Sequence, residues 1–137
     1  MEPALFSSPP YLTLVGWSVV LLAIHIVLQS TLATRELGLD WNAGPRDGGL
    51  KPQGILAGRA ARAFNNFRET YPAFLALALA LAIRDNAPAW GIHGAWAWFI
   101  CRFAYIPLYL AGIPYIRSLV WLGSMAGLAV MFVALIQ

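Results

Sequence analysis

Charged residues and cysteines are scarce in this chain. Of its 137 residues, 11% are charged and 60% are hydrophobic. The mean hydropathy of +0.66 is typical of proteins that cross a membrane several times and excludes an ordinary soluble domain. The single cysteine, Cys101, excludes an internal disulfide. We therefore expect an integral membrane protein without disulfides.

Metal ligands and signs of nucleic-acid binding are also lacking. His25 and His93 are the two histidines, and neither has a second histidine or a carboxylate at metal-ligand spacing, so no metal site is expected. The net charge of +3 is better explained by membrane topology than by a nucleic-acid partner.

Long apolar runs, in contrast, are abundant. A helix needs about 20 apolar residues to cross the hydrocarbon core of a bilayer, and helices are the spanning elements that fit segments of this length. Four such segments are present: 11–33, 57–83, 90–110 and 116–136. The sequence predicts an all-α, integral membrane four-helix bundle in which residues 1–137 form a single domain.

Basic residues are distributed unevenly between the connections. Six lie in or beside the first connection: Arg35, Arg46, Lys51, Arg59, Arg62 and Arg68. Arg117 lies at the third connection, and Arg84 is the one basic residue of the second. Because basic residues are enriched on the cytoplasmic side, we expect the first and third connections to be cytoplasmic and both termini to lie outside.

The longest connection, residues 37–54, is rich in Gly, Pro and Asp, which favour turns. No Lys-Ser or Lys-Thr pair follows its glycines and no strand is expected before them, so it is not a phosphate-binding loop. We expect a mobile loop at the membrane interface.

Four tryptophans occur near the expected ends of the third and fourth spans: Trp90, Trp96, Trp98 and Trp121. Tryptophan is enriched where a membrane meets water. We expect these residues to form an aromatic belt rather than a cofactor site.

A polar stripe interrupts the second span. Arg62, Asn66 and Glu69 are separated by four and three residues. At about 100° per residue they fall on one face of a helix, together with Arg59 and Asn65. Such a stripe indicates either a site for a small polar ligand or a buried network between helices.

The third span carries a second polar stripe, formed by Arg102, Tyr105 and Tyr109. Exposing Arg102 to lipid would cost about 3 kcal/mol, so this arginine is expected to face protein. Its partner is either Glu69 or a bound anion. A simple Arg102–Glu69 ion pair that fixes the helix register is the structural alternative.

On this side of the expected bundle, four arginines outnumber the acid Glu69: Arg59, Arg62, Arg102 and Arg117. Arg117 lies near the start of the fourth span, where the helix dipole disfavours a cation. An anion there would be held by Arg117, Ser118 and free backbone amides.

Glutathione satisfies each requirement of such a site. It has carboxylates for the arginines, an ammonium group that Glu69 could accept, and a thiol. A neighbouring guanidinium or hydroxyl donor shifts a thiol toward its nucleophilic thiolate form. The polar residues therefore favour a zwitterionic thiol peptide as the ligand.

The segment 62–72, RAFNNFRETYP, resembles the second-helix signature of the MAPEG family, the membrane-associated proteins of eicosanoid and glutathione metabolism. The likeness extends to five later residues: Arg102, Tyr105, Tyr109, Arg117 and Ser118. The resemblance implies a homotrimer of four-helix subunits, with glutathione bound between neighbouring subunits near the cytoplasmic side.

The resemblance also implies residue roles. Seven residues would bind glutathione: Arg35, Arg62, Asn66, Glu69, Arg102, Tyr105 and Tyr109. Arg117 would activate the thiol, with Ser118 beside it as in the prostaglandin E synthase branch. Asn65 stands where that branch has a second arginine and Thr70 where the leukotriene branch has a tyrosine, so neither specialised substrate is implied.

Three functions are compatible with these residues. The favoured one is a membrane-bound, glutathione-dependent transferase or peroxidase acting on lipophilic electrophiles that enter from the bilayer. The alternative is a non-catalytic scaffold or lipid-binding protein of the same family. A small proton-coupled exporter using Glu69 is less favoured, because the first span contains no acid.

Overall fold

The protein is all-helical. A computed structural model describes residues 10–137, in which there are five helices and no strand. They are α1 (Pro10–Leu37), α2 (Leu39–Ala43), α3 (Ile55–Ile83), α4 (Gly91–Ala111) and α5 (Ile116–Ile136). The expected side of the N-terminus falls on residues outside this range.

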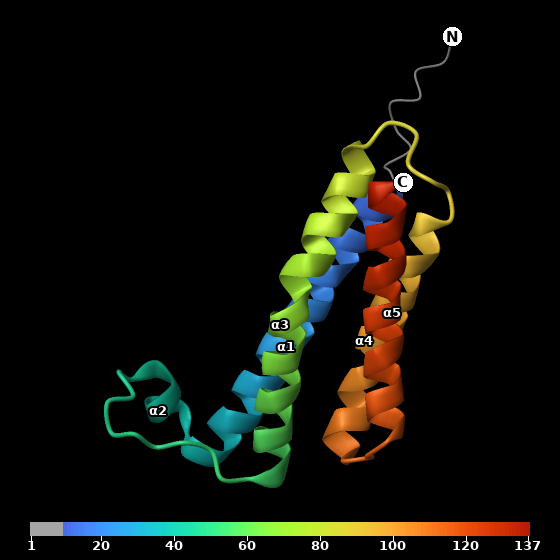
Figure 1. The fold of residues 1–137 in the computed structure, drawn as a ribbon. Coiled ribbons are helices and arrows are strands. Elements are labelled where there is room, and N and C mark those ends of the chain that lie inside the picture. The colour runs from blue at the N-terminus through green and yellow to red at the C-terminus, as the bar shows by residue number, and fades with distance from the viewer. Residues whose placement is uncertain (1–9) are drawn as a thin grey trace.

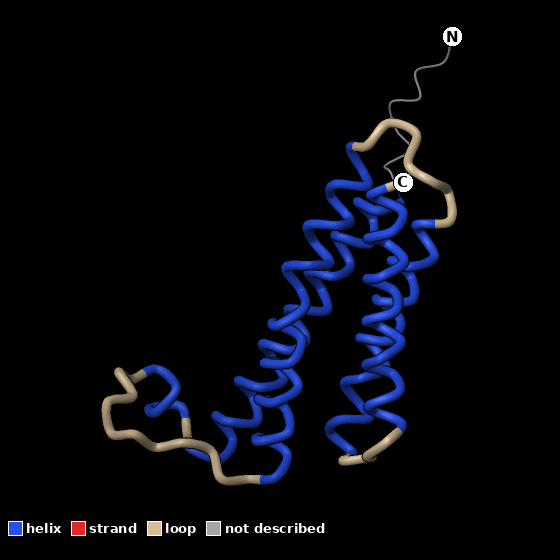
Figure 2. The backbone as a smooth tube through the Cα atoms, viewed as in Figure 1, coloured by secondary structure: helices blue, strands red, loops and turns tan. Residues whose placement is uncertain are grey.

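The four long helices associate in two pairs. α4 packs most extensively against α5, and α1 packs mainly against α3, while α3 also contacts α4 and α5 and joins the pairs. Figure 1 shows the long helices running along one another, with α2 projecting away from them. The connections gather at the two ends of the bundle (Figure 2).

Two of the helices, α1 and α5, are long and apolar enough to cross a membrane by length and composition. Their outward faces carry large hydrophobic side chains that are more than half exposed, among them Val27 on α1 and Phe132 on α5. An apolar exterior of this kind is stable in hydrocarbon and unfavourable in water.

Glycine allows α4 and α5 to touch at one end of the bundle. A Cβ atom added to Gly94 would lie 2.6 Å from the Gly127 carbonyl oxygen, and one added to Gly127 would lie 2.6 Å from that of Gly94. Small residues permit such close approach of membrane helices. At the same end Arg84 Nη1 donates to the carbonyl oxygens of Ala134 and Leu135, at 2.6 and 2.7 Å. We call this the packed end, where α3 and α5 finish and α4 begins.

Aromatic side chains fill the centre of the bundle. Phe67, Phe74 and Trp98 are fully buried, and the rings of Phe74 and Trp98 stack at 3.8 Å. His25 of α1 is buried against Phe67, with ring centroids 4.7 Å apart. The expectation that Trp98 belongs to an interfacial belt is therefore wrong, because this side chain packs into the core between helices.

The expectation of a loop throughout residues 37–54 is wrong over Leu39–Ala43, which form α2. Gly38, at φ 90°, separates α2 from α1. Arg46 then stabilises the short helix, because its guanidinium lies 4.4 Å above the Trp41 ring and donates to Asn42 Oδ1 at 2.6 Å. The helix could not be predicted from the sequence, because these stabilising contacts are between side chains and a segment of this length shows no hydrophobic periodicity.

Candidate functional site

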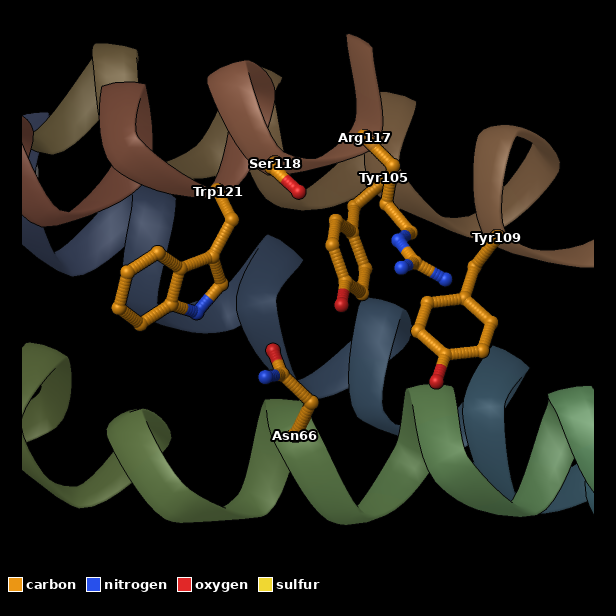
Figure 3. A pocket seen from close by; sticks show the side chains of 6 residues that line it. All are labelled: Asn66, Tyr105, Tyr109, Arg117, Ser118 and Trp121. Atoms are coloured by element: carbon orange, nitrogen blue, oxygen red, sulfur yellow. The ribbon is translucent and has the colours of Figure 1, made fainter. Parts of the chain in front are cut away.

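A polar cavity of about 240 Å³ lies between α3, α4 and α5, at the opposite end from the Gly94–Gly127 contact. We call this the cavity end, where α3 and α5 begin and α4 finishes. Six residues line the cavity: Asn66, Tyr105, Tyr109, Arg117, Ser118 and Trp121. Figure 3 shows Asn66 approaching from α3 and the other five from α4 and α5. Five of the six were expected from the sequence to belong to one site.

A tight connection places Arg117 over α4. The Gly112 N–H bonds to the Tyr109 carbonyl at 3.0 Å, and that of Ile113 bonds to the Leu108 carbonyl at 3.2 Å, which closes the helix C-terminus. Gly112 has φ 72°, a left-handed conformation that glycine adopts without strain. The chain reverses within four residues, and the Arg117 guanidinium lies 4.6 Å above the Tyr109 ring.

The two tyrosines of α4 form one wall of the cavity. Tyr105 and Tyr109 are one helical turn apart and their rings lie 5.3 Å from each other. Tyr105 is buried and Tyr109 is half-buried. Each ring also lies beside a cation. The Arg102 guanidinium lies 4.8 Å from the centre of the Tyr105 ring, and Arg117 lies over the Tyr109 ring.

Arg102 is fully buried behind this wall. Its Nη1 donates to Asn66 Oδ1 at 2.8 Å. Its Nε and Nη2 have no hydrogen-bond partner among the described residues. Within residues 10–137 no ion pair joins Arg102 to Glu69, whose side chain is exposed. The structural alternative of a simple Arg102–Glu69 ion pair is therefore not what the structure shows, because the Asn66 amide oxygen accepts the hydrogen bond from Arg102.

Three residues expected to bind glutathione lie away from this cavity: Arg35, Arg62 and Glu69. Arg62 and Glu69 are exposed, and Glu69 lines a separate open hollow of about 440 Å³ with Asn65 and Arg68. Arg35 lies beside another hollow, of about 410 Å³, formed by polar residues of α1 and α2. Their role at a glutathione site stays a prediction.

Trp121 was not singled out as a site residue from the sequence, whereas Arg59 was expected on the polar stripe and among the surplus arginines. Trp121, which was expected in an interfacial belt, lines the cavity, and its buried Nε1 has no partner in the described part of the chain. Its position four residues after Arg117, on the same helical face, was the available signal. Arg59 donates from Nη1 to the Leu110 carbonyl at 2.9 Å, which ties the start of α3 to the end of α4.

Comparison with known families agrees with this geometry. The MAPEG family model matches residues 14–137. The chain belongs to the MAPEG family. The resemblance noted in the second, third and fourth spans is thereby confirmed over nearly the whole chain. No curated protein and no solved structure shows a significant match to this chain.

Membership of the MAPEG family, together with the two apolar helices, establishes a membrane protein. At the level of the family it supports a glutathione-related function of the transferase or peroxidase type. The MAPEG match includes every residue of the polar cavity. The cavity is accordingly the place where such a function is best sought.

Proposed function

We propose that this MAPEG protein is a membrane-bound, glutathione-dependent transferase or peroxidase that acts on lipophilic electrophiles. Glutathione would be the co-substrate, bound at the polar cavity with its sulfur near Arg117. The second substrate would enter from the bilayer, since apolar side chains cover the outer faces of α1 and α5.

The proposal is supported chiefly by two guanidinium groups, one lining the cavity and one behind it, beside a lining that contains no acid. Arg117 lines the cavity and Arg102 lies fully buried behind it. None of the described lining residues is an acid, and no ion pair involves either arginine within residues 10–137. A buried cation that forms no ion pair is costly, so guanidinium groups at a cavity lined by no acid favour a functional site for an anion.

The cavity residues fit the chemistry of a thiol. Arg117 would stabilise a negatively charged sulfur, and the Ser118 hydroxyl would be a second donor beside it. The thiol proton would pass to water, the sulfur would attack the electrophilic carbon, and a carbon–sulfur bond would form as the leaving group departs. Tyr105, Tyr109 and Asn66 would orient the peptide so that the sulfur is held in attacking position.

The cavity is small for a complete tripeptide site. Its volume of about 240 Å³ lies below the range of about 300–1,000 Å³ common for small-molecule sites. A homotrimer would complete the site, with a neighbouring copy contributing some of the residues that lie outside the cavity: Arg35, Arg62 and Glu69. In this arrangement all four long helices would span the membrane, with the cavity end on the cytoplasmic side.

Calorimetry with the detergent-purified protein tests this proposal. We expect saturable glutathione binding, and loss of most of the affinity in Tyr109→Ala, which removes a cavity wall. Arg46→Ala is the matched control, because the hydrogen bonds and the cation–π contact of Arg46 within residues 10–137 are with Asn42 and Trp41 on the projecting segment.

Two other outcomes would replace the proposal. A wild-type protein that gives no heat with glutathione but binds a lipophilic probe would support the non-catalytic scaffold. Proton-driven substrate flux in liposomes that depends on Glu69 would support the exporter.

A further inference from the structure

Arg102 lies behind the cavity and is hydrogen-bonded to one of the residues that line it. Its side chain has no exposed surface and does not line the cavity. Within residues 10–137 its one hydrogen bond runs from Nη1 to Asn66 Oδ1, and Asn66 does line the cavity. Arg102 therefore reaches the cavity lining by a hydrogen bond to the Asn66 amide and by packing against the Tyr105 ring, and of these two contacts the hydrogen bond is the directional one.

The chemistry of this contact fixes which way the amide faces. A guanidinium group donates hydrogen bonds and cannot accept them. The atom of Asn66 that meets Arg102 must consequently be the carbonyl oxygen, since the opposite orientation would set two donors against each other. The Asn66 NH₂ is thereby left free of Arg102, with its two N–H donors available at the cavity wall.

The remaining polar groups of the cavity also donate. Arg117 and the Trp121 Nε1–H are obligate donors, and the latter is buried without a partner among the described residues. The hydroxyls of Tyr105, Tyr109 and Ser118 can donate as well. Asn66 Oδ1 is the one side-chain acceptor of the lining that cannot itself donate, and it already accepts a hydrogen bond from Arg102.

We propose that Arg102 is a positioning residue that locks the Asn66 amide with its NH₂ toward the cavity, so that the cavity accepts the anionic thiolate or carboxylate end of its ligand and excludes the ammonium end. This inference about how glutathione is oriented rests on the function proposed above. The ammonium group would then lie outside the cavity, on the side of Glu69.

The surroundings of Arg102 favour a stable hydrogen bond from this residue to Asn66, which we call the clamp. The guanidinium carbon lies 4.8 Å from the Tyr105 ring centre and 5.6 Å from that of Phe67. Aromatic faces stabilise a desolvated cation without supplying a hydrogen-bond acceptor. Arg102 thus lies against two aromatic rings while its Nη1 donates to Asn66.

A double-mutant cycle tests the clamp. Arg102→Met keeps a side chain of similar length and removes a buried unpaired charge, so the fold should not lose stability. Glutathione affinity should fall about tenfold in Arg102→Met and in Asn66→Ala, and the double variant should bind no more weakly than Asn66→Ala. Additive losses in the double variant would overturn the positioning role.

Asn66→Asp tests the polarity of the site, because it replaces two donors with an acceptor and gives Arg102 an ion-pair partner. We expect glutathione affinity to fall more than tenfold while the melting temperature does not decrease. Unchanged or tighter binding would mean that the ammonium end enters the cavity, and would overturn the proposed orientation.

Nuclear magnetic resonance separates this inference from the proposed function. The side-chain amide signal of Asn66, identified by its loss in Asn66→Ala, can be followed without any ligand. It should shift in Arg102→Met and stay in place in the control Arg46→Met. If wild type binds no glutathione, the function proposed above fails, whereas an unshifted signal in Arg102→Met overturns the clamp itself.

Discussion

The two ends of the α4–α5 pair are built on opposite principles. At the packed end, Gly94 and Gly127 bring the backbones together, and Arg84 donates to the last carbonyls of α5. At the cavity end, the same helices carry Tyr105, Arg117 and other polar side chains around a space of about 240 Å³.

One helix pair thus combines a closely packed end, which stabilises the fold, with a site whose buried polar groups are unfavourable for folding. An unpaired buried guanidinium and an unpartnered indole N–H each carry a desolvation penalty. Close packing elsewhere in the pair offsets this penalty. The cations at the two ends therefore differ in role. Arg84 donates hydrogen bonds to carbonyl oxygens that have no partner within the last turn of α5, whereas Arg117 lines a cavity.

The largest effect is expected from Arg117→Ala at the cavity end. If Arg117 stabilises the thiolate, conjugation of glutathione to a chromogenic aryl halide should slow about 100- to 1,000-fold, the cost typical of losing one donor to a developing anion. Steady-state kinetics in detergent would measure this, with calorimetry to show how much glutathione binding remains. Wild-type turnover in Arg117→Ala would remove this residue from the chemistry.

An intermediate effect is expected at the packed end from Gly127→Ala. The new Cβ atom would lie 2.6 Å from the Gly94 carbonyl oxygen, so α4 and α5 must separate, at a cost of about 1–3 kcal/mol. Thermal denaturation in detergent would detect it. Gly16→Ala is the matched control, since nothing lies within 4 Å of a Cβ atom there. Equal stability of the two variants would contradict the close helix contact.

The smallest effect is expected from Arg84→Met, which should lower the free energy of unfolding by about 1 kcal/mol by freeing two carbonyls of α5. Glutathione affinity should stay unchanged, because Arg84 lies far from the cavity along α3. Arg102→Met should show the reverse, with weaker binding and no loss of stability. Similar results for both variants would abolish the distinction between the two ends.

Much of the site could be predicted from helical spacing. Residues three or four apart share a face, so Tyr105, Tyr109 and Arg102 were expected together, and Asn66 opposite them. Spacing could not show that Asn66, rather than Glu69, meets Arg102, because both lie on the same stripe. Nor could it show that Trp121 belongs to the cavity, since an interfacial tryptophan has the same local sequence pattern.

By itself the sequence determined the membrane setting, the helical architecture and the family, because these depend on composition, apolar length and local spacing, all of which are properties of the chain. The tertiary structure decided which polar groups meet. It placed Glu69 on an exposed face, gave Arg102 an amide as its hydrogen-bond acceptor, and placed Trp121 in the lining of the cavity. Such pairings depend on the rotation of each helix against its neighbours, which is set by packing over the whole interface and not by spacing within one helix.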